Sequence, residues 1–210
     1  VKVEDAPNKL SWYTSLRVAE FRAPEFLVKV NAHDATKLAS DPVKGVVEGR
    51  YLFGAAMNGA EVGWSLTASP GRFTPTDAQG FVYGETAPWW EENEFTTDGA
   101  LLASGKGRLD PKGELVVEAG KARTPENRPQ VYTLEASVTD VNRQEVAGRK
   151  SFTIHPAAFY VGLRGPGGFA EANQPFTVDV MALKSEGEQR HAGAKVTVTL
   201  KRHAWNTVQK

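Results

Sequence analysis

The stretch that decides the fold is VYTLEASVT, residues 131–139. Apolar side chains occupy its even-numbered positions, and polar side chains occupy most of the positions between them. Successive side chains of a β-strand point to opposite faces of a sheet, so this alternation predicts a strand with one face on a core. The expected buried positions are Tyr132, Leu134, Ala136 and Val138.

The same period of two recurs along the chain. Pro175–Val180 and Lys195–Lys201 alternate as cleanly, and the less regular strand candidates are Phe26–Ala32, Val46–Phe53, Ala60–Thr67, Glu114–Ala119 and Ser151–His155. Turn sequences such as Asn58-Gly59 and Asp110-Pro111-Lys112-Gly113 lie between these segments. No window carries a sustained helical stripe. Many short strands separated by turns predict an all-β chain of tandem β-sandwich domains with little helix.

A weak internal repeat suggests the domain organisation. The spacing from Phe26 to Ala60 nearly equals the spacing from Phe159 to Ala194, and similar strand starts surround both pairs. We expect residues 1–19 to be a terminal strand or linker of a preceding module. Residues 20–155 are expected to form a sandwich with a Pro- and Gly-rich insertion near 69–107. Residues 156–210 are expected to begin a second, incomplete sandwich, because they hold too few strands for the usual complement of about seven.

The composition excludes several classes of function. The 25 basic and 25 acidic residues cancel, whereas nucleic-acid binders need a basic field. No run of 18 apolar residues is present, so we expect no membrane span in this chain. The absence of cysteine removes disulfides, thiolate catalysis and Cys-ligated metals. The chain starts Val1-Lys2-Val3 without an initiator Met or a signal pattern, and we interpret it as an interior piece of a longer protein.

No residue pattern predicts catalysis. The histidines are scattered without metal-ligand spacing, and their positions are His33, His155, His191 and His203. A Gly-x-Ser-x-Gly nucleophile elbow is absent. The glycine-rich segment 162–168 lacks the Gly-Lys-Ser/Thr ending that would hold a phosphate. We therefore expect no catalytic residues, no metal and no cofactor, and the chain is predicted not to be an enzyme.

The paired tryptophans Trp89 and Trp90 are the candidate contact residues. They lie in a polar, acidic segment that continues with Glu91 and Glu92. Adjacent indoles in such a segment suit packing against a neighbouring domain, contact with a protein partner, or an aromatic platform for a sugar. A third tryptophan, Trp64, alternates within a predicted strand and is expected in the core.

Several motifs appear in the order found in a known family. They are Val18–Phe26, Tyr51–Gly54, Asn58–Trp64, Tyr132–Asp140, His155–Leu163 and Val196–Trp205. Together these motifs resemble an interior part of the bacterial alpha-2-macroglobulin family. The resemblance implies fibronectin- or immunoglobulin-like macroglobulin (MG) domains in tandem.

The resemblance also implies a function. Members of this family are broad-spectrum endopeptidase inhibitors that trap a protease after it cuts a bait region, and many capture it through a thioester. A thioester requires cysteine, so bait and thioester are expected outside this chain. The implied partners are neighbouring macroglobulin domains and, through the parent protein, target endopeptidases. The implied location is periplasmic or cell-surface in a bacterium, with a membrane-anchored lipoprotein among the options for the parent. The alternative function is a carbohydrate-binding or adhesin β-sandwich that uses Trp89 and Trp90.

Overall fold

The computed structural model describes residues 2–5, 10–13, 23–32, 38–76, 79–84, 99–167, 170–171, 173–187 and 189–201. The strands are β1 (Lys2–Asp5), β2 (Leu10–Tyr13), β3 (Phe26–Ala32), β4 (Pro42–Tyr51), β5 (Glu61–Pro70), β6 (Val82–Tyr83), β7 (Ala100–Arg108), β8 (Glu114–Lys121), β9 (Gln130–Thr139), β10 (Glu145–Ile154), β11 (Phe159–Arg164) and β12 (Asp179–Lys184). The helical content of these residues is one 3-10 turn, Pro125–Asn127. The predicted all-β class is confirmed.

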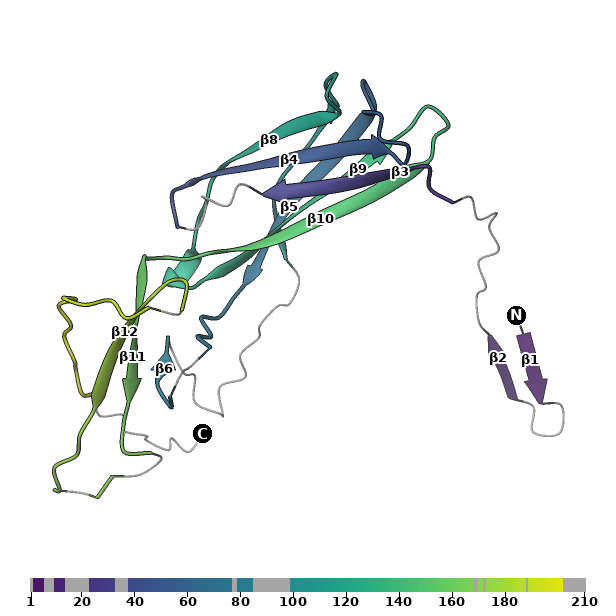
Figure 1. Ribbon diagram of the computed structural model, residues 1–210. Helices are drawn as coiled ribbons and strands as arrows, with labels where there is room; N and C mark the ends of the chain where they lie inside the picture. Colours follow the sequence, from purple (N-terminus) through teal and green to yellow (C-terminus); the bar gives the residue numbers. More distant parts are fainter. Residues whose placement is uncertain are drawn as a thin grey trace, which may run out of the picture.

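Two antiparallel sheets form a sandwich between residues 26 and 154 (Figure 1). One sheet has the strand order β3-β4-β8 and the other has the order β10-β9-β5-β7. The inner faces share one hydrophobic core, to which β9 contributes the alternating residues predicted from VYTLEASVT. All of Tyr132, Leu134, Ala136 and Val138 are buried, so the strand that decides the fold behaves as expected.

Glycines let the two sheets approach closely. The inward positions of β4 alternate between valine and glycine, and Leu134 of β9 fills the space beside Gly45. On the open edge, a Cβ on Gly105 of β7 would lie 2.8 Å from the Trp64 indole. The glycines therefore act as sockets for large side chains from the facing or neighbouring strand.

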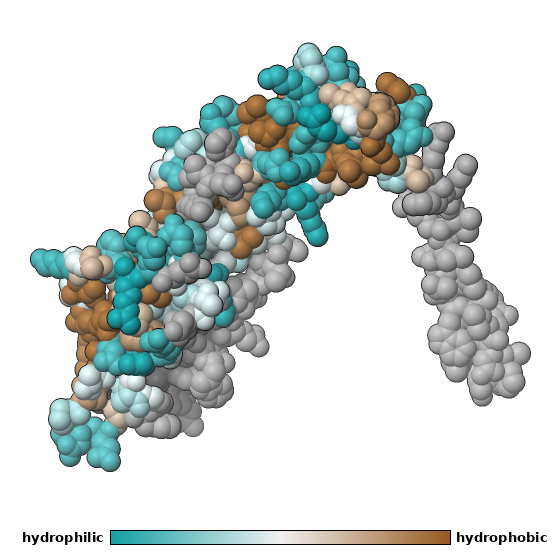
Figure 2. Space-filling view, in the orientation of Figure 1, coloured by the Kyte–Doolittle hydropathy of each residue, from teal (hydrophilic) through white to brown (hydrophobic). Residues whose placement is uncertain are grey.

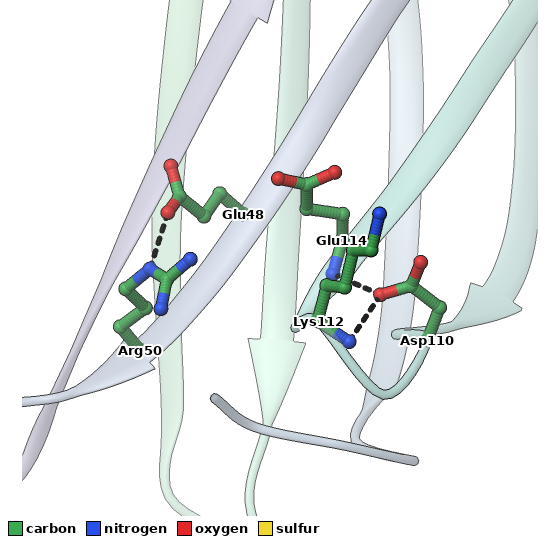
Figure 3. Close-up of polar contacts among 5 residues, drawn as sticks. All are labelled: Glu48, Arg50, Asp110, Lys112 and Glu114. Atoms are coloured by element: carbon green, nitrogen blue, oxygen red, sulfur yellow. Dashed lines mark hydrogen bonds and ion pairs between the residues drawn. The ribbon is translucent and has the colours of Figure 1, made fainter. Parts of the chain in front are cut away.

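Aspartates shape two turns at the same end of the sandwich: one passes from β7 to β8 in the facing sheet, and the other closes the β9–β10 hairpin. Asp110 Oδ1 accepts hydrogen bonds from the backbone N–H groups of Lys112 (2.8 Å) and Glu114 (2.9 Å), as Figure 3 shows. The N–H of Gly113 donates to the carbonyl oxygen of Asp110 at 2.8 Å, which closes the turn predicted for Asp110-Pro111-Lys112-Gly113. Buried Asp140 accepts equivalent bonds from the N–H groups of Asn142 and Gln144, both at 2.8 Å.

The remaining strands lie outside the sandwich. β11 pairs with β12 on one side and with β6 on the other, giving a second three-stranded sheet (Figure 1). β1 and β2 form a separate hairpin. In sequence, β6 lies between β5 and β7, which are both strands of the sandwich. The sheet β12-β11-β6 therefore combines two strands that follow the sandwich with one from a connection inside its sequence.

Part of the region near 69–107, expected to be an irregular insertion, is regular strand in the structure. Ser69 and Pro70 complete β5, and Ala100–Arg108 form β7, an edge strand of the sandwich. The alternation pattern did not predict β7, because two of its inward positions are Gly105 and Gly107, which produce no apolar alternation. Trp64 and Leu115 supply the apolar cover there instead.

In the last part of the chain, one strand prediction was wrong in extent and another was wrong altogether. The segment predicted at Pro175–Val180 pairs only from Asp179 onward, because its partner β11 ends at Arg164 before Gly165-Pro166. Lys195–Lys201 forms no strand, although its pattern alternates, because a strand needs a hydrogen-bonded neighbour as well as a pattern. The apolar side chains of that segment are exposed, up to 83% for Leu200.

Replacing Gly45 by alanine is expected to destabilise the sandwich. The new methyl group would overlap Leu134 Cδ2 and lie 3.2 Å from the carbonyl oxygen of Asn31. Overpacking of this kind costs about 1–3 kcal/mol in the free energy of unfolding. The matched control is Gly63→Ala on the outer face of β5, where the nearest atom is Ser137 Oγ at 3.5 Å. That change is expected to be neutral or to stabilise by about 0.4–1 kcal/mol. Urea unfolding measures both, and equal losses would contradict this account.

Tyr132→Phe is expected to loosen the link between the sheets. The Tyr132 hydroxyl of β9 donates to the carbonyl oxygen of Arg123 and accepts from its N–H, both at 2.9 Å, just after β8 ends. Losing two such bonds costs about 1–3 kcal/mol in unfolding free energy. Tyr51→Phe, which keeps the ring contacts of Tyr51 with Phe26 and Phe53, is the control. A Tyr132→Phe protein with an unchanged thermal midpoint would show that the link is not stabilising.

Candidate interaction surfaces

The two described histidines each contact an aromatic residue. His155 Nδ1 lies 2.8 Å from the hydroxyl oxygen of Tyr160, and the ring of His191 stacks on Phe159 at 4.3 Å. Burial raises the pKa of the Tyr160 hydroxyl above its ordinary value, so it stays protonated near neutral pH. The described part of the chain holds no group of three or more His, Cys, Asp or Glu residues placed to bind a metal. His33 and His203 lie outside it.

The tryptophan candidates have different outcomes. Trp89 and Trp90 lie outside the described residues, so their predicted contact with a domain, partner or sugar stays a prediction. Trp64 points inward from β5 and is partly buried against the sandwich core, as expected. Among the described residues, no helix has the length and apolar character needed to cross a bilayer.

The surface between the sandwich and the second sheet is built from aromatic rings. Phe73, just after β5, stacks on Tyr160 of β11 with 3.9 Å between ring centroids and an interplanar angle of 12°. It also makes a T-shaped contact with Tyr83 of β6, with 5.2 Å between ring centroids and an interplanar angle of 77°. The Tyr83 ring covers Gly162, where a Cβ would lie 2.5 Å away. Sequence reasoning missed this cluster because its members are far apart in the chain.

A charged residue completes this surface. Arg164, the last residue of β11, donates from Nε and Nη2 to Asp179 Oδ2 of β12 at 3.1 and 2.8 Å. Its Nη1 donates to the carbonyl oxygen of Gln79 at 3.0 Å. The guanidinium carbon lies 4.6 Å from the centroid of the buried Phe81 ring, which is cation–π range. One side chain therefore contacts both β12 and the chain segment that leads into β6.

The opposite face of the second sheet is apolar and open. Val82, Leu163 and Val180 lie opposite one another across β6, β11 and β12 and are 48%, 42% and 42% exposed. Brown hydrophobic surface is visible over this part of the molecule in Figure 2. A continuous row of exposed apolar side chains on a sheet face is typical of a surface that another element covers.

The end of the sandwich where β3 begins carries a second apolar group. Phe53 is 81% exposed and stacks on Tyr51 at 5.2 Å, while Tyr51 packs edge-on against buried Phe26. Leu52 and Leu27 are also exposed there, and Figure 2 shows hydrophobic surface at this end. Stacking on Tyr51 favours one orientation of the Phe53 ring, and a side chain that is already ordered loses less entropy when another surface covers it.

The outer face of the three-stranded sheet is charged. Arg50 of β4 donates to Glu48 Oε1 (Figure 3), and this bond raises the pKa of the arginine further above its ordinary value. Lys44 pairs with Glu118 of β8 at 2.6 Å. Solvent-exposed pairs of this kind contribute at most about 1 kcal/mol each to the stability of the fold.

Comparison with known proteins gives one consistent result. Residues 27–156, well over half of the chain, match the family described as the bacterial alpha-2-macroglobulin MG5 domain. An alpha-2-macroglobulin homolog of a Nostoc species is 27% identical over 201 residues, which cover 96% of this chain and 10% of that protein. The chain thus spans about a tenth of the length of this curated relative.

Solved structures agree on the fold. The native conformation of Escherichia coli alpha-2-macroglobulin superimposes with a TM-score of 0.60 at 18% identity, covering 87% of this chain and 12% of the other. Salmonella alpha-2-macroglobulin reacted with methylamine gives 0.59 at 21% identity, with coverages of 88% and 13%. From the match over residues 27–156 and the sandwich that those residues form, this chain belongs to the bacterial alpha-2-macroglobulin MG5 domain family.

Proposed function

We propose that this chain is a non-catalytic structural and interaction module of a bacterial protease trap of the alpha-2-macroglobulin type. The observation that carries the proposal is the family match over the sandwich, together with surfaces made of rings and aliphatic rows instead of catalytic groups. Such surfaces suit contacts between domains of one large protein. The parent is a broad-spectrum endopeptidase inhibitor in this proposal, and the chain itself is not an enzyme.

The trigger and the covalent trap lie elsewhere in the parent. The Escherichia coli relative is activated by porcine elastase and by trypsin, and the Salmonella relative reacts with methylamine. A primary amine opens a thioester, and a thioester needs a cysteine, which this chain lacks. The proposal therefore assigns bait cleavage and covalent capture to other parts of the parent, and a supporting role to this module. A periplasmic or cell-surface location is part of the same proposal.

The domain organisation proposed for the chain follows the expected division. Residues 1–19 end a preceding module, residues 20–155 form the first macroglobulin-like domain, and residues 156–210 begin a second one. The open row formed by Val82, Leu163 and Val180 supports an unfinished second domain, because a one-sheet fold leaves one apolar face in water. The rest of that domain is proposed to come from the parent chain.

The chain alone is expected not to inhibit proteases. Trapping requires a cleavable trigger and a body large enough to enclose an enzyme, and a 22.8 kDa module offers neither. The measurement is trypsin or elastase activity on a large protein substrate with the chain in molar excess. The intact Escherichia coli relative serves as the positive control. Stoichiometric inhibition by the chain would overturn its supporting role.

A version extended past Lys210 with its natural sequence is expected to be more stable and more monomeric. Each apolar side chain of the open row that becomes covered adds up to about 1.5–3 kcal/mol of stabilisation. Sedimentation velocity and thermal unfolding compare the two lengths, and Leu163→Ser in the short chain serves as a control that lowers apolar self-association. Equal stability and equal association state for both lengths would contradict the unfinished second domain.

A further inference from the structure

The segment between β5 and β7 bridges two parts of the molecule. Its described residues up to and just past β6, 71–76 and 79–84, are called the crossover here. At its start, the N–H of Gly71 donates to the carbonyl oxygen of Pro129 at 2.9 Å, which fixes this point to the sandwich next to β9. At its end, Val82 and Tyr83 pair with Leu163 and Gly162 of β11.

The distance along the chain between these two attachments is short. Phe73 follows Gly71 by two residues, and its ring already stacks on Tyr160 of the second sheet. Two residues span at most about 7 Å, so little slack separates the bond to the sandwich from the contact with the sheet. Pro75 continues the contact, since a Cβ on Gly187, after β12, would lie 3.4 Å from Pro75 Cα.

A second attachment acts at the direct junction. The chain passes from β10 to β11 through His155. The backbone of His155 forms an isolated parallel β-bridge with Leu38, and its carbonyl oxygen accepts a hydrogen bond from the N–H of Ala39 at 2.9 Å. The His155 ring also lies 2.8 Å from the Tyr160 hydroxyl. A sheet held at one linker can rotate about it, whereas a sheet held at the junction and along β6 cannot rotate without breaking one attachment.

We propose that the crossover locks the sheet β12-β11-β6 to the sandwich, so that the two move as one body. Arg164 stabilises this attachment, which we call the lock. Its guanidinium donates to the Gln79 carbonyl oxygen, lies over Phe81 and pairs with Asp179. The partner of the crossover is the first strand of the following sheet, bound by strand addition and by aromatic stacking. The inference concerns the chain itself and stands whether or not the parent traps proteases.

Hydrogen exchange of the full chain tests the lock. Gly162→Ala places a methyl group 2.5 Å from the Tyr83 ring and is expected to release β6. Exchange in peptides covering 79–84 should then accelerate at least about tenfold, the change produced by a loss of about 1.4 kcal/mol. The matched control is Gly165→Ala, one residue past β11, where a Cβ meets nothing within 4 Å. Unchanged exchange at 79–84 in Gly162→Ala would overturn the proposal.

Arg164 is tested separately. Arg164→Lys keeps the charge and loses the planar fork that reaches Asp179 and Gln79 together, so exchange at 79–84 should rise in this variant as well. Arg50→Lys on the outer face of the sandwich is the control, because Arg50 pairs with Glu48 away from the crossover. If both lysine variants exchange like the unmodified chain, Arg164 does not fasten the lock.

A cross-link covers the case in which Gly162→Ala unfolds the second sheet entirely. The chain has no cysteine, so Val82→Cys combined with Leu163→Cys allows one disulfide between β6 and β11. Directly paired residues lie about 4.5–5.5 Å apart, within disulfide reach, and mild oxidation should link them nearly completely. The control pair, Val82→Cys with Val180→Cys, is separated by β11 and should stay reduced. Failure of the first pair to link, or equal linking of both, would overturn the pairing of β6 with β11.

Discussion

The close approach of β4 and β9, where Leu134 fills the space beside Gly45, is the constraint on which the sandwich depends. It sets the distance between the two sheets, and with it the depth at which Val47, Leu66 and Val138 meet. The hydroxyl of Tyr132 adds a polar link from β9 to the chain that leaves β8. Dense packing and a few satisfied polar groups thus hold the sheets in one register. The surfaces carried by the sandwich itself are positioned by this core.

The sequence predicted a strand correctly where its alternating pattern coincided with neighbouring strands that could pair with it. The alternation of VYTLEASVT predicted β9 correctly because that strand lies inside a sheet, paired on both sides. The same alternation in residues 195–201 predicted a strand that is absent, because nothing in the described chain pairs with it. β7 was missed for the opposite reason: its inward glycines carry no pattern, although neighbouring side chains cover them. Periodicity reports which face is apolar, whereas strand formation also depends on neighbours that are distant in sequence.

The interaction surfaces were less accessible to sequence reasoning than the fold. The aromatic cluster joins Phe73, Tyr83 and Tyr160, and no local pattern connects residues so far apart. Arg164 likewise looks like an ordinary strand-end arginine until β12 and the crossover are placed around it. The paired tryptophans, which stood out in the sequence, lie beyond the described residues. The contact role predicted for the paired tryptophans therefore stays a prediction.

The crossover also bears on how such modules recombine during evolution. A gene segment cut at the sandwich borders would carry with it a loop whose rings are shaped for a sheet encoded downstream. Placed before an unrelated domain, that loop would expose Phe73, Phe81 and Tyr83 to solvent. Exposed apolar side chains of this kind promote aggregation. The unit that can be shuffled intact is accordingly larger than the sandwich, and includes at least β11 and β12. Duplication of the sandwich is thus expected to copy β11 and β12 along with it.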